Sequence, residues 1–351
     1  MSKRIVIMAG GTGGHVVPAL AVAHYLLEQN WQVSWIGTRK GMENRVIPEN
    51  EIAMDFLSVN GLRGKGTLAL FKMPWMLIKA CLEARKILQQ RKPDVVLGMG
   101  GFVAGPGGLM AKLMAIPLVI HEQNRVPGTT NRLLSRLANK VLQAFPGSFP
   151  ASKLAIFTGN PLRKEFSQAI HKQERDSANP LHILVMGGSL GAQRLNEVLP
   201  DALALLNNVQ VRHQTGEAML QQVTEAYADK SVAATVMAFI SDVVGAYTWA
   251  DLVICRAGAM TVSEVAAMGI PSILVPYPYA IDDHQTANAE YLVTRGAATM
   301  IAQPQLTVEF LAAQIQQLTP QLEAMAVAAR QSAKFDATEK VAEQCMLEAM
   351  A

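Results

Sequence analysis

The stretch Met8-Ala-Gly-Gly-Thr-Gly-Gly-His-Val-Val-Pro-Ala-Leu20 joins an apolar run to a helical pattern. The run before it, Arg4–Met8, is typical of a buried parallel strand, and residues 19–27 have apolar positions at helical spacing. The glycines between them let a ligand approach main-chain N–H groups closely, and a helix start favours negative charge. His15 stands at this turn and can change its charge near neutral pH. The alternative is a tight turn with a hydrogen-bonded histidine.

The two common nucleotide-binding motifs do not fit this stretch. The dinucleotide fingerprint requires a glycine at its sixth position, which is Val16 when counted from Gly11. The Walker pattern requires lysine after its last glycine, whereas His15 follows Gly14. The sequence therefore disfavours an NAD or ATP site of the usual kind.

The composition is that of a folded protein with about two domains. Of 351 residues, 50% are hydrophobic and 17% charged, which argues against disorder, and the net charge of +3 gives no nucleic-acid signature. Cys81, Cys255 and Cys345 lie far apart, form no metal-ligand spacing and fit a reducing cytoplasm. We expect neither a cleaved leader nor a transmembrane span.

Strand-like and helix-like segments alternate along the chain, which predicts parallel sheets that bind ligands at the carboxyl ends of their strands. After a hinge at Gly159-Asn-Pro, residues 181–192 repeat the opening strand and glycine turn. Further expected strands are residues 31–36, 94–97, 117–121, 140–142, 210–213, 235–239, 252–255 and 272–275.

The predicted fold class is α/β, with two Rossmann-like domains facing a cleft. The first domain would span residues 1–160, and the second would span residues 161–335. A helix at residues 336–351 would pack back on the first domain. Two such domains suggest chemistry on a phosphorylated small molecule.

The second informative stretch is Arg256-Ala-Gly-Ala-Met-Thr-Val-Ser-Glu264, which follows an expected strand and opens a helix. Its amides would form a second anion site, and the Glu264 carboxylate could accept both hydroxyls of a ribose. The alternative is a capping box, with Thr261 as the cap and Glu264 three residues later.

A third polar cluster opens another expected helix. His284, Gln285 and Asn288 share one helical face that could read sugar hydroxyls, or they form an ordinary polar helix start. The neighbouring Asp282-Asp283 is not an Asp-x-Asp metal pair. We therefore expect helix N-termini and Arg163 or Arg256, rather than a required Mg²⁺, to meet a diphosphate.

Taken in order, these motifs resemble the MurG family of bacterial peptidoglycan glycosyltransferases over nearly the whole chain. Met260 stands where many relatives have Leu. The motifs are Gly10-Gly-Thr-Gly-Gly-His15, His121-Glu-Gln-Asn124, Gly159-Asn-Pro-x-Arg163, Gly187-Gly-Ser-x-Gly191, Arg256-x-Gly-Ala-x-Thr-Val-Ser-Glu264 and Asp283-His-Gln-Thr286.

The resemblance implies the two-domain GT-B fold with a deep cleft. It also implies an inverting transfer of N-acetylglucosamine from UDP-N-acetylglucosamine to lipid I, the undecaprenyl-pyrophosphoryl-MurNAc-pentapeptide, which makes lipid II. His15 would be the base, with Glu122 and Asn124 as alternatives, and no metal or other cofactor is expected.

The resemblance assigns the donor to a set of side chains and loop amides. Ser189 and Arg163 would belong to the diphosphate site, Ile240 would contact uracil through its backbone, and Glu264 would bind the ribose. The full set is Thr12, Gly13, Gly14, Asn124, Arg163, Ser189, Ile240, Ala259, Met260, Thr261, Val262, Ser263, Glu264 and Gln285. Gln285 would read the transferred sugar. Four residues of the first domain, Thr12, Gly13, Gly14 and Asn124, would close over the sugar end of the donor.

A basic segment, residues 61–92, has eight basic residues and one acid. Leu77, Cys81, Ala84 and Leu88 form a helical stripe that we expect to face the core, while Trp75 and Lys79 would share an outward face. Together with Lys72 they would bind an anionic membrane surface. The alternative is a solvated basic helix. With the resemblance, this segment predicts a peripheral enzyme on the anionic cytoplasmic face of the cell inner membrane, with cell-wall synthesis proteins as further partners.

Two rival functions remain at this point. Another UDP-N-acetylglucosamine enzyme of the same fold, such as an epimerase, would share the donor site without a lipid acceptor. The second rival is a non-catalytic protein that binds a nucleotide sugar. UDP release with and without lipid I separates these possibilities.

Overall fold

A computed structural model describes residues 2–59, 67–168, 179–187 and 192–351, except for the side chains of residues 67–72 and 281. The chain forms two compact units, Met1–Arg163 with Phe335–Ala351 and Lys164–Lys334. The first unit thus ends three residues later than the predicted boundary at residue 160.

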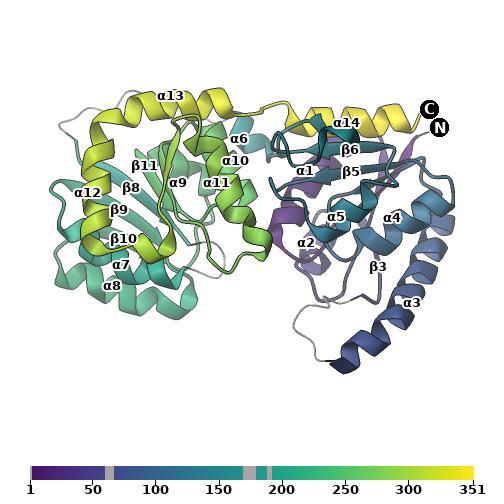
Figure 1. The fold of residues 1–351 in the computed structure, drawn as a ribbon, viewed down its shortest axis with the longest axis horizontal. Helices are drawn as coiled ribbons and strands as arrows, with labels where there is room; N and C mark the ends of the chain where they lie inside the picture. Colours follow the sequence, from purple (N-terminus) through teal and green to yellow (C-terminus); the bar gives the residue numbers. More distant parts are fainter. Residues whose placement is uncertain (1, 60–66, 169–178, 188–191) are drawn as a thin grey trace. The chain divides into compact units, whose positions relative to one another are not determined.

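The first unit contains a parallel sheet of seven strands in the order β3-β2-β1-β4-β5-β6-β7 (Figure 1). The strands are β1 (Arg4–Met8), β2 (Gln32–Gly37), β3 (Ala53–Phe56), β4 (Val95–Gly98), β5 (Leu118–Glu122), β6 (Lys140–Gln143) and β7 (Ile156–Phe157). The alternation of strands and helices predicted this parallel sheet, but it did not reveal β3 or β7, because these strands are short and half-buried.

Helices cover both faces of this sheet because successive side chains of a strand point to opposite sides. Ile5 and Ile7 belong to one apolar core, whereas Val6 and Met8 belong to the other. The first core is closed by α1 (Gly13–Glu28), α2 (Glu43–Glu49) and α14 (Ala337–Glu348), and the second by α3 (Thr67–Arg91), α4 (Ala104–Leu113) and α5 (Thr129–Leu134). Figure 1 shows α14 beside α1, so the end of the chain completes the first unit.

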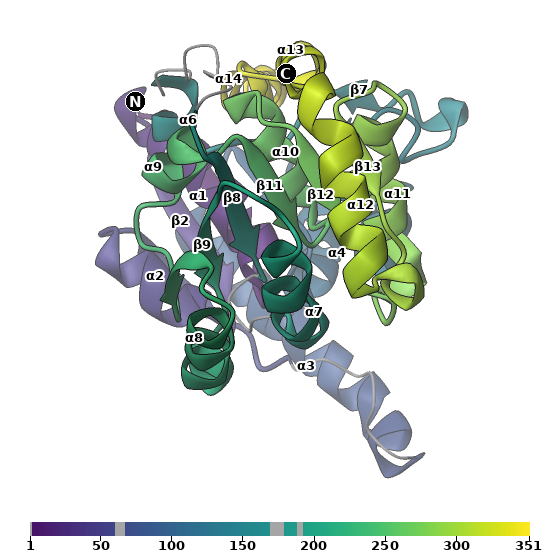
Figure 2. The same cartoon turned by 90° about the vertical axis from the view of Figure 1, so that its left-hand side faces the viewer.

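The second unit repeats this architecture with a six-stranded parallel sheet in the order β10-β9-β8-β11-β12-β13. Its strands are β8 (Leu181–Met186), β9 (Val209–Gln214), β10 (Ala233–Met237), β11 (Leu252–Cys255), β12 (Ser272–Leu274) and β13 (Ala298–Met300). Its helices are α6 (Lys164–Gln168), α7 (Gln193–Ala204), α8 (Leu220–Asp229), α9 (Val243–Trp249), α10 (Ala259–Met268), α11 (His284–Val293), α12 (Val308–Leu318) and α13 (Leu322–Ser332). Side chains of α7, α8 and α12 share one core with the sheet. Figure 2 shows where these helices lie beside the strands.

Three local expectations were wrong. Helix α1 begins at Gly13, so Gly13 and Gly14 form its first turn instead of the preceding loop. The strand expected at residues 235–239 ends at Met237. In α3, Leu77 is exposed, and the buried face of this helix is Ala80, Ala84, Ile87 and Leu88. Leu77 fits the helical spacing, but spacing does not reveal that α3 runs beyond the layer it covers (Figure 1).

The helix α14 is expected to be necessary for the stability of the first unit. Val341 is fully buried in the core with β1 and β4, so Val341→Asp would place an unpaired carboxylate there and cost several kcal/mol. Leu347→Asp on the exposed side of the same helix is the matched control. Hydrogen exchange of peptides from β1 and β4 should accelerate in the first variant and not in the second, and equal rates would contradict this packing.

Candidate functional site

The first unit places its polar loops at one edge of the sheet. Strands β1 and β4 are neighbours, and the strand order continues in opposite directions from them, which is where parallel sheets bind ligands. The loop after β1, residues 9–12, and the loop after β4, residues 99–103, begin at this point. The loop after β5, residues 123–128, lies on the next strand. Thr12, Gly13, Gly14, His15 and Asn124 are therefore gathered at one edge, as the alternation of strands predicted.

Two glycines of the loop after β4 let it pack directly on the loop after β1. Gly101 has a φ of 78°, and a Cβ atom there would overlap with the carbonyl oxygen of Gly10. Gly100 has a φ of 96°, and its Cβ atom would lie 3.0 Å from the Cε1 atom of His15. The His15 ring therefore lies against a backbone that has no side chain, and a substitution at either glycine would displace the loops.

The buried carboxylate of Glu43 connects the loops after β1 and β2. Its oxygens accept hydrogen bonds from the Gly11 amide at 3.0 Å, the Thr38 amide at 2.9 Å and the Thr38 hydroxyl at 2.8 Å. A buried carboxylate is stable only when such donors replace water. No local pattern in the sequence indicates this role of Glu43, because the Gly11 amide that it binds lies 32 positions away along the chain.

A second buried carboxylate, that of Glu122, organises the loop after β5. It accepts hydrogen bonds from the Asn124 amide at 2.9 Å, the Gly128 amide at 3.1 Å and the Asn131 side chain at 3.0 Å. The Asn124 side chain donates a further one at 3.3 Å. Because these donors occupy its oxygens, Glu122 is poorly suited to accept a proton from a substrate, and this geometry disfavours it as a base.

His15 is half-buried in the first turn of α1, and its Nδ1 atom lies 2.9 Å from the Oε1 atom of Gln123. Gln123 stands between Glu122 and Asn124 in the quoted motif, yet sequence reasoning gave it no role. The ring of His15 is thus held by its Nδ1 side at the same edge as the glycine loops.

In the second unit, helix α10 begins at Ala259 with Gly258 as its N-cap residue. The capping box considered above is therefore wrong, because Thr261 lies inside the helix and Glu264 falls in its second turn. Among the residues that the structure describes, no side chain caps this helix, and its first turn has no acid. The first-turn amides have no helical carbonyl to bind, so this end of α10 favours an anion.

The Glu264 carboxylate is half-buried, and its Oε2 atom accepts a hydrogen bond from the Tyr247 hydroxyl at 3.3 Å. Burial raises the pKa of Cys255, at the end of β11, to about 12, and the charge of Glu264 adds to this effect. The Ser263 hydroxyl donates to the Ala259 carbonyl at 2.9 Å within the helix.

Other predicted residues of the second unit hold its loops together. The Arg256 guanidinium donates to the carbonyls of Val275 and Pro276 at 3.1 and 3.2 Å and to Gln303 at 2.6 Å, which disfavours it as the ligand of a diphosphate. Gln285 accepts a hydrogen bond from the Tyr277 amide at 2.9 Å. The loops after β11 and β12 are thus fixed beside the start of α10.

Three further residues were predicted to bind the donor: Ile240, Arg163 and Ser189. The Ile240 amide donates to the Gln214 side chain at 3.3 Å, so this N–H already has a partner. Arg163 is exposed at the end of the first unit. Ser189 lies outside the described residues. Among the residues that are described, no three His, Cys, Asp or Glu side chains are grouped so that they could hold a metal.

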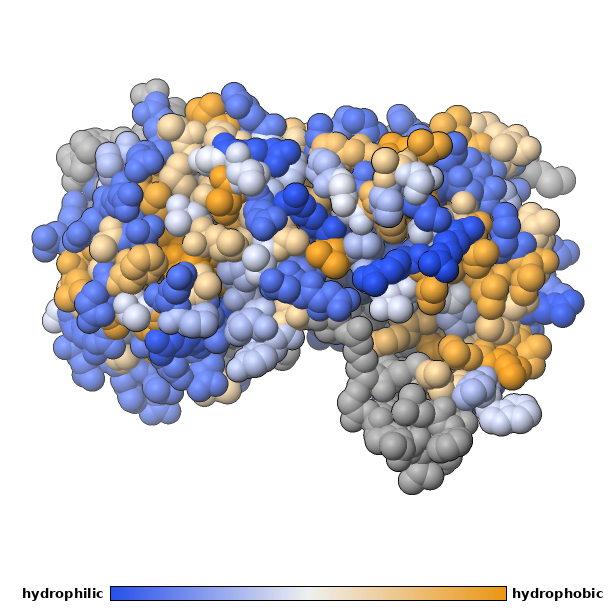
Figure 3. Space-filling view, in the orientation of Figure 1, coloured by the Kyte–Doolittle hydropathy of each residue, from blue (hydrophilic) through white to orange (hydrophobic). Residues whose placement is uncertain are grey.

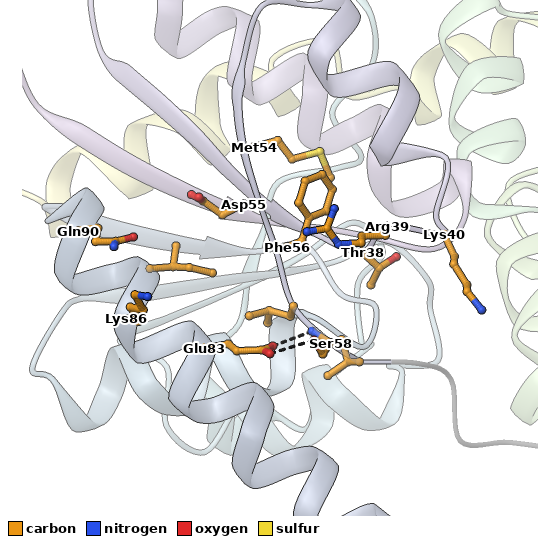
Figure 4. Close-up of a pocket in the computed structure, with 13 residues that line it drawn as sticks. Thr38, Arg39, Lys40, Met54, Asp55, Phe56, Ser58, Glu83, Lys86 and Gln90 are labelled. Carbon is orange, nitrogen blue, oxygen red and sulfur yellow. Dashed lines mark hydrogen bonds between the residues drawn. The ribbon is translucent and has the colours of Figure 1, made fainter.

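A separate cavity of about 590 Å³ lies between the end of β3 and helix α3 (Figure 4). The Arg39 guanidinium lies 4.6 Å from the centre of the Phe56 ring beside it, and Glu83 accepts hydrogen bonds from the amide and hydroxyl of Ser58 at 2.7 and 2.9 Å. None of the predicted site residues lines this cavity.

Comparison with known proteins identifies the class of this fold and site. Residues 5–143 match the Glycosyltransferase family 28 N-terminal domain, and residues 182–344 match its C-terminal domain. The chain therefore belongs to glycosyltransferase family 28.

Individual relatives narrow this class. A UDP-N-acetylglucosamine--N-acetylmuramyl-(pentapeptide) pyrophosphoryl-undecaprenol N-acetylglucosamine transferase from Methylococcus capsulatus is 57% identical, with 99% of each chain covered. The enzyme of the same name from Aeromonas hydrophila is 50% identical over 98% of this chain and 97% of its own. The crystal structure of Acinetobacter baumannii MurG superposes with a TM-score of 0.86 at 43% identity, covering 98% of this chain and 99% of that one. The predicted resemblance to the MurG family is confirmed.

The Glu43 carboxylate is expected to stabilise the glycine loop. In Glu43→Gln, the neutral amide has one accepting oxygen in place of two, so one loop donor loses its acceptor and the others lose a charged partner, at a cost of about 1.5–3 kcal/mol. Glu49→Gln, at an exposed position of the same helix, is the control. Urea unfolding should show the loss only in the first variant, and equal free energies of unfolding would refute the role of this carboxylate.

Proposed function

We propose that the protein transfers N-acetylglucosamine from UDP-N-acetylglucosamine to the muramyl sugar of lipid I, which makes lipid II for peptidoglycan synthesis. The observation that carries this proposal is the match of both halves to one glycosyltransferase family, together with relatives of 57% and 50% identity that bear this activity in their names. The match extends over almost the whole chain, so it includes both polar sheet edges described above.

In the proposed mechanism, His15 removes the proton from the acceptor hydroxyl as that oxygen attacks the anomeric carbon. An imidazole nitrogen that carries no proton can accept this one, as a general base does. The saturation of Glu122 by hydrogen bonds supports His15 over this alternative. The departing UDP gains negative charge, which the first-turn amides of α10 would stabilise. Thr12, Gly13, Gly14 and Asn124 would contact the sugar, and Gln285 would read it.

The rival epimerase reaction needs a direct test because fold alone does not exclude it. The UDP-N-acetylglucosamine 2-epimerase of Neisseria meningitidis, crystallised with UDP-N-acetylglucosamine, superposes with a TM-score of 0.68 at 16% identity, covering 98% of this chain and 100% of that one. That likeness concerns the fold only.

The test incubates the purified full chain and labelled UDP-N-acetylglucosamine with or without a short-chain lipid I analogue. A labelled disaccharide product that requires the analogue supports the proposal, and it should persist in a chelator because we propose no metal cofactor. An epimerised donor without acceptor, or no reaction, would overturn it. Complete loss that Mg²⁺ restores would refute only the metal-free diphosphate site.

Glu264 is proposed to bind the ribose hydroxyls of the donor. Glu264→Gln should raise the KM for UDP-N-acetylglucosamine by about 10- to 150-fold, since a hydrogen bond to a charged group contributes roughly 1.5–3 kcal/mol. Tyr247→Phe is the matched control, because it removes the hydroxyl that contacts this carboxylate and leaves the charge. An unchanged KM in Glu264→Gln, with lower stability in both variants, would make Glu264 a structural residue.

We also propose that the enzyme docks on anionic lipid at the cytoplasmic face of the inner membrane. Trp75 and Leu82 of α3 are 76% and 61% exposed, and Leu113 of the adjacent α4 is 69% exposed. Figure 3 shows apolar residues gathered over these two helices. Lys79 and Lys112 are exposed beside them, although Lys79 also pairs with Glu83 at 3.7 Å. The side chain of Lys72 lies outside the described residues.

These features suit shallow insertion, in which apolar side chains enter the headgroup layer and each lysine contributes about 1 kcal/mol on an anionic surface. In the part of the chain that the structure describes, no helix is long and apolar enough to cross a membrane. A lipid-linked acceptor would require proximity of this kind.

Sedimentation with vesicles tests the docking surface. The protein should bind anionic vesicles more strongly than neutral ones, and Trp75→Ser with Leu82→Ser should weaken that binding without lowering turnover on a water-soluble acceptor. Leu205→Ser with Val327→Ser removes two exposed apolar side chains from the second unit and serves as the control. Equal binding of the two double variants would refute this assignment.

A further inference from the structure

Three side chains of the first unit form a continuous chain of hydrogen bonds that ends at His15. The Nε2 atom of His121 lies 2.9 Å from the Gly159 carbonyl oxygen. The side-chain nitrogen of Gln123 lies 3.1 Å from the Nδ1 atom of His121. The side-chain oxygen of Gln123 lies 2.9 Å from the Nδ1 atom of His15.

The direction of the first link follows from the chemistry of its ends. A backbone carbonyl only accepts hydrogen bonds, so the Nε2 atom of His121 must carry a proton. His121 is fully buried, and burial lowers its pKa to about 4, although the bond to Gly159 opposes this shift. The ring is therefore neutral near pH 7, which leaves its Nδ1 atom as an acceptor.

This acceptor fixes the orientation of the Gln123 amide. Only the amide nitrogen can donate to the Nδ1 atom of His121, and the same nitrogen lies 3.2 Å from the His121 carbonyl oxygen, which is a second acceptor. The flipped amide would place oxygen against two acceptors. Gln123 is 1% exposed, and the Asn160 side chain donates to the main-chain carbonyl of Gln123 at 3.1 Å, which holds this residue in place. Its oxygen must consequently face His15.

An amide oxygen accepts and never donates, so the Nδ1 atom of His15 carries the proton of the neutral ring. We propose that Gln123, itself oriented by His121, is a positioning residue that holds His15 in the tautomer whose Nε2 atom has a free lone pair. This inference rests on the proposed function of His15 as the base. The hydrogen bond at one ring nitrogen determines which nitrogen is protonated, and the backbone of Gly100 against the ring limits its rotation.

This relay, the hydrogen-bonded chain of His121, Gln123 and His15, differs from a carboxylate–histidine pair because Gln123 is neutral. It fixes the proton and the direction of the ring without a charge that would stabilise imidazolium. The effect of losing Gln123 should therefore appear in kcat, whereas donor binding, which we assign to other residues, should change little.

The direct test is the ¹⁵N NMR spectrum of the histidine rings, recorded without substrate at a pH about two units above the ordinary histidine pKa. His15→Ala assigns the His15 signals. We expect a protonated Nδ1 and an unprotonated Nε2 in the unaltered protein, and a shift toward protonated Nε2 in Gln123→Met, which has a similar size but no amide. A spectrum of the unaltered protein with a protonated Nε2 atom in His15 would overturn the proposal, whether or not Gln123→Met folds.

The kinetic test uses lipid I analogue and UDP-N-acetylglucosamine. Gln123→Met should lower kcat by about 10- to 100-fold, less than the roughly 10²- to 10⁴-fold effect of a general base itself, while the KM for the donor stays within about twofold. Equal kcat values for Gln123→Met and the unaltered protein would refute the relay. If the unaltered protein has no transferase activity, the proposed function fails, and the NMR result still decides the tautomer.

Discussion

The edge of the first sheet depends on two carboxylates that are buried among loop amides. Glu43 and Glu122 are each less than 3% exposed, and a charge in such a place is tolerated only when donors replace its water. The donors include backbone N–H groups of the loops after β1, β2 and β5. Because a loop that moved away would leave a buried charge unsatisfied, these contacts hold the loops in one arrangement.

In the second unit, the loops are held by side chains that donate hydrogen bonds instead of accepting them. Arg256 donates to carbonyl oxygens after β12, and Asn288 donates to the Ala257 carbonyl at 3.3 Å. The acceptors in these contacts are carbonyl oxygens. The first turn of α10 contains no acid that could bind its amides. The two units are thus suited to different tasks. Acids occupy loop amides around His15, whereas the start of α10 favours an anion, as a diphosphate site requires.

The specific function depends on these details more than on the architecture. Two parallel sheets with flanking helices also occur in an epimerase that is 16% identical. The proposed transfer depends on the polar edge of the first unit and on the orientation of His15, which a likeness in fold does not describe. That edge combines loop glycines, two buried acids and the half-buried His15. The fold positions these residues, but their chemistry comes from their side chains.

The sequence by itself determined the apolar strands, the glycine turns and the family, because these depend on short-range patterns and on the order of motifs. It did not reveal β3, β7 or β13, whose short segments become strands by pairing with neighbours. Only the tertiary structure placed Glu43 on Gly11, oriented Gln123 on His15 and excluded Thr261 as a helix cap. The contacts of Glu43 and Gln123 join residues 32 and 108 positions apart. A local pattern contains no information about such partners, since packing of the whole sheet decides which side chains meet.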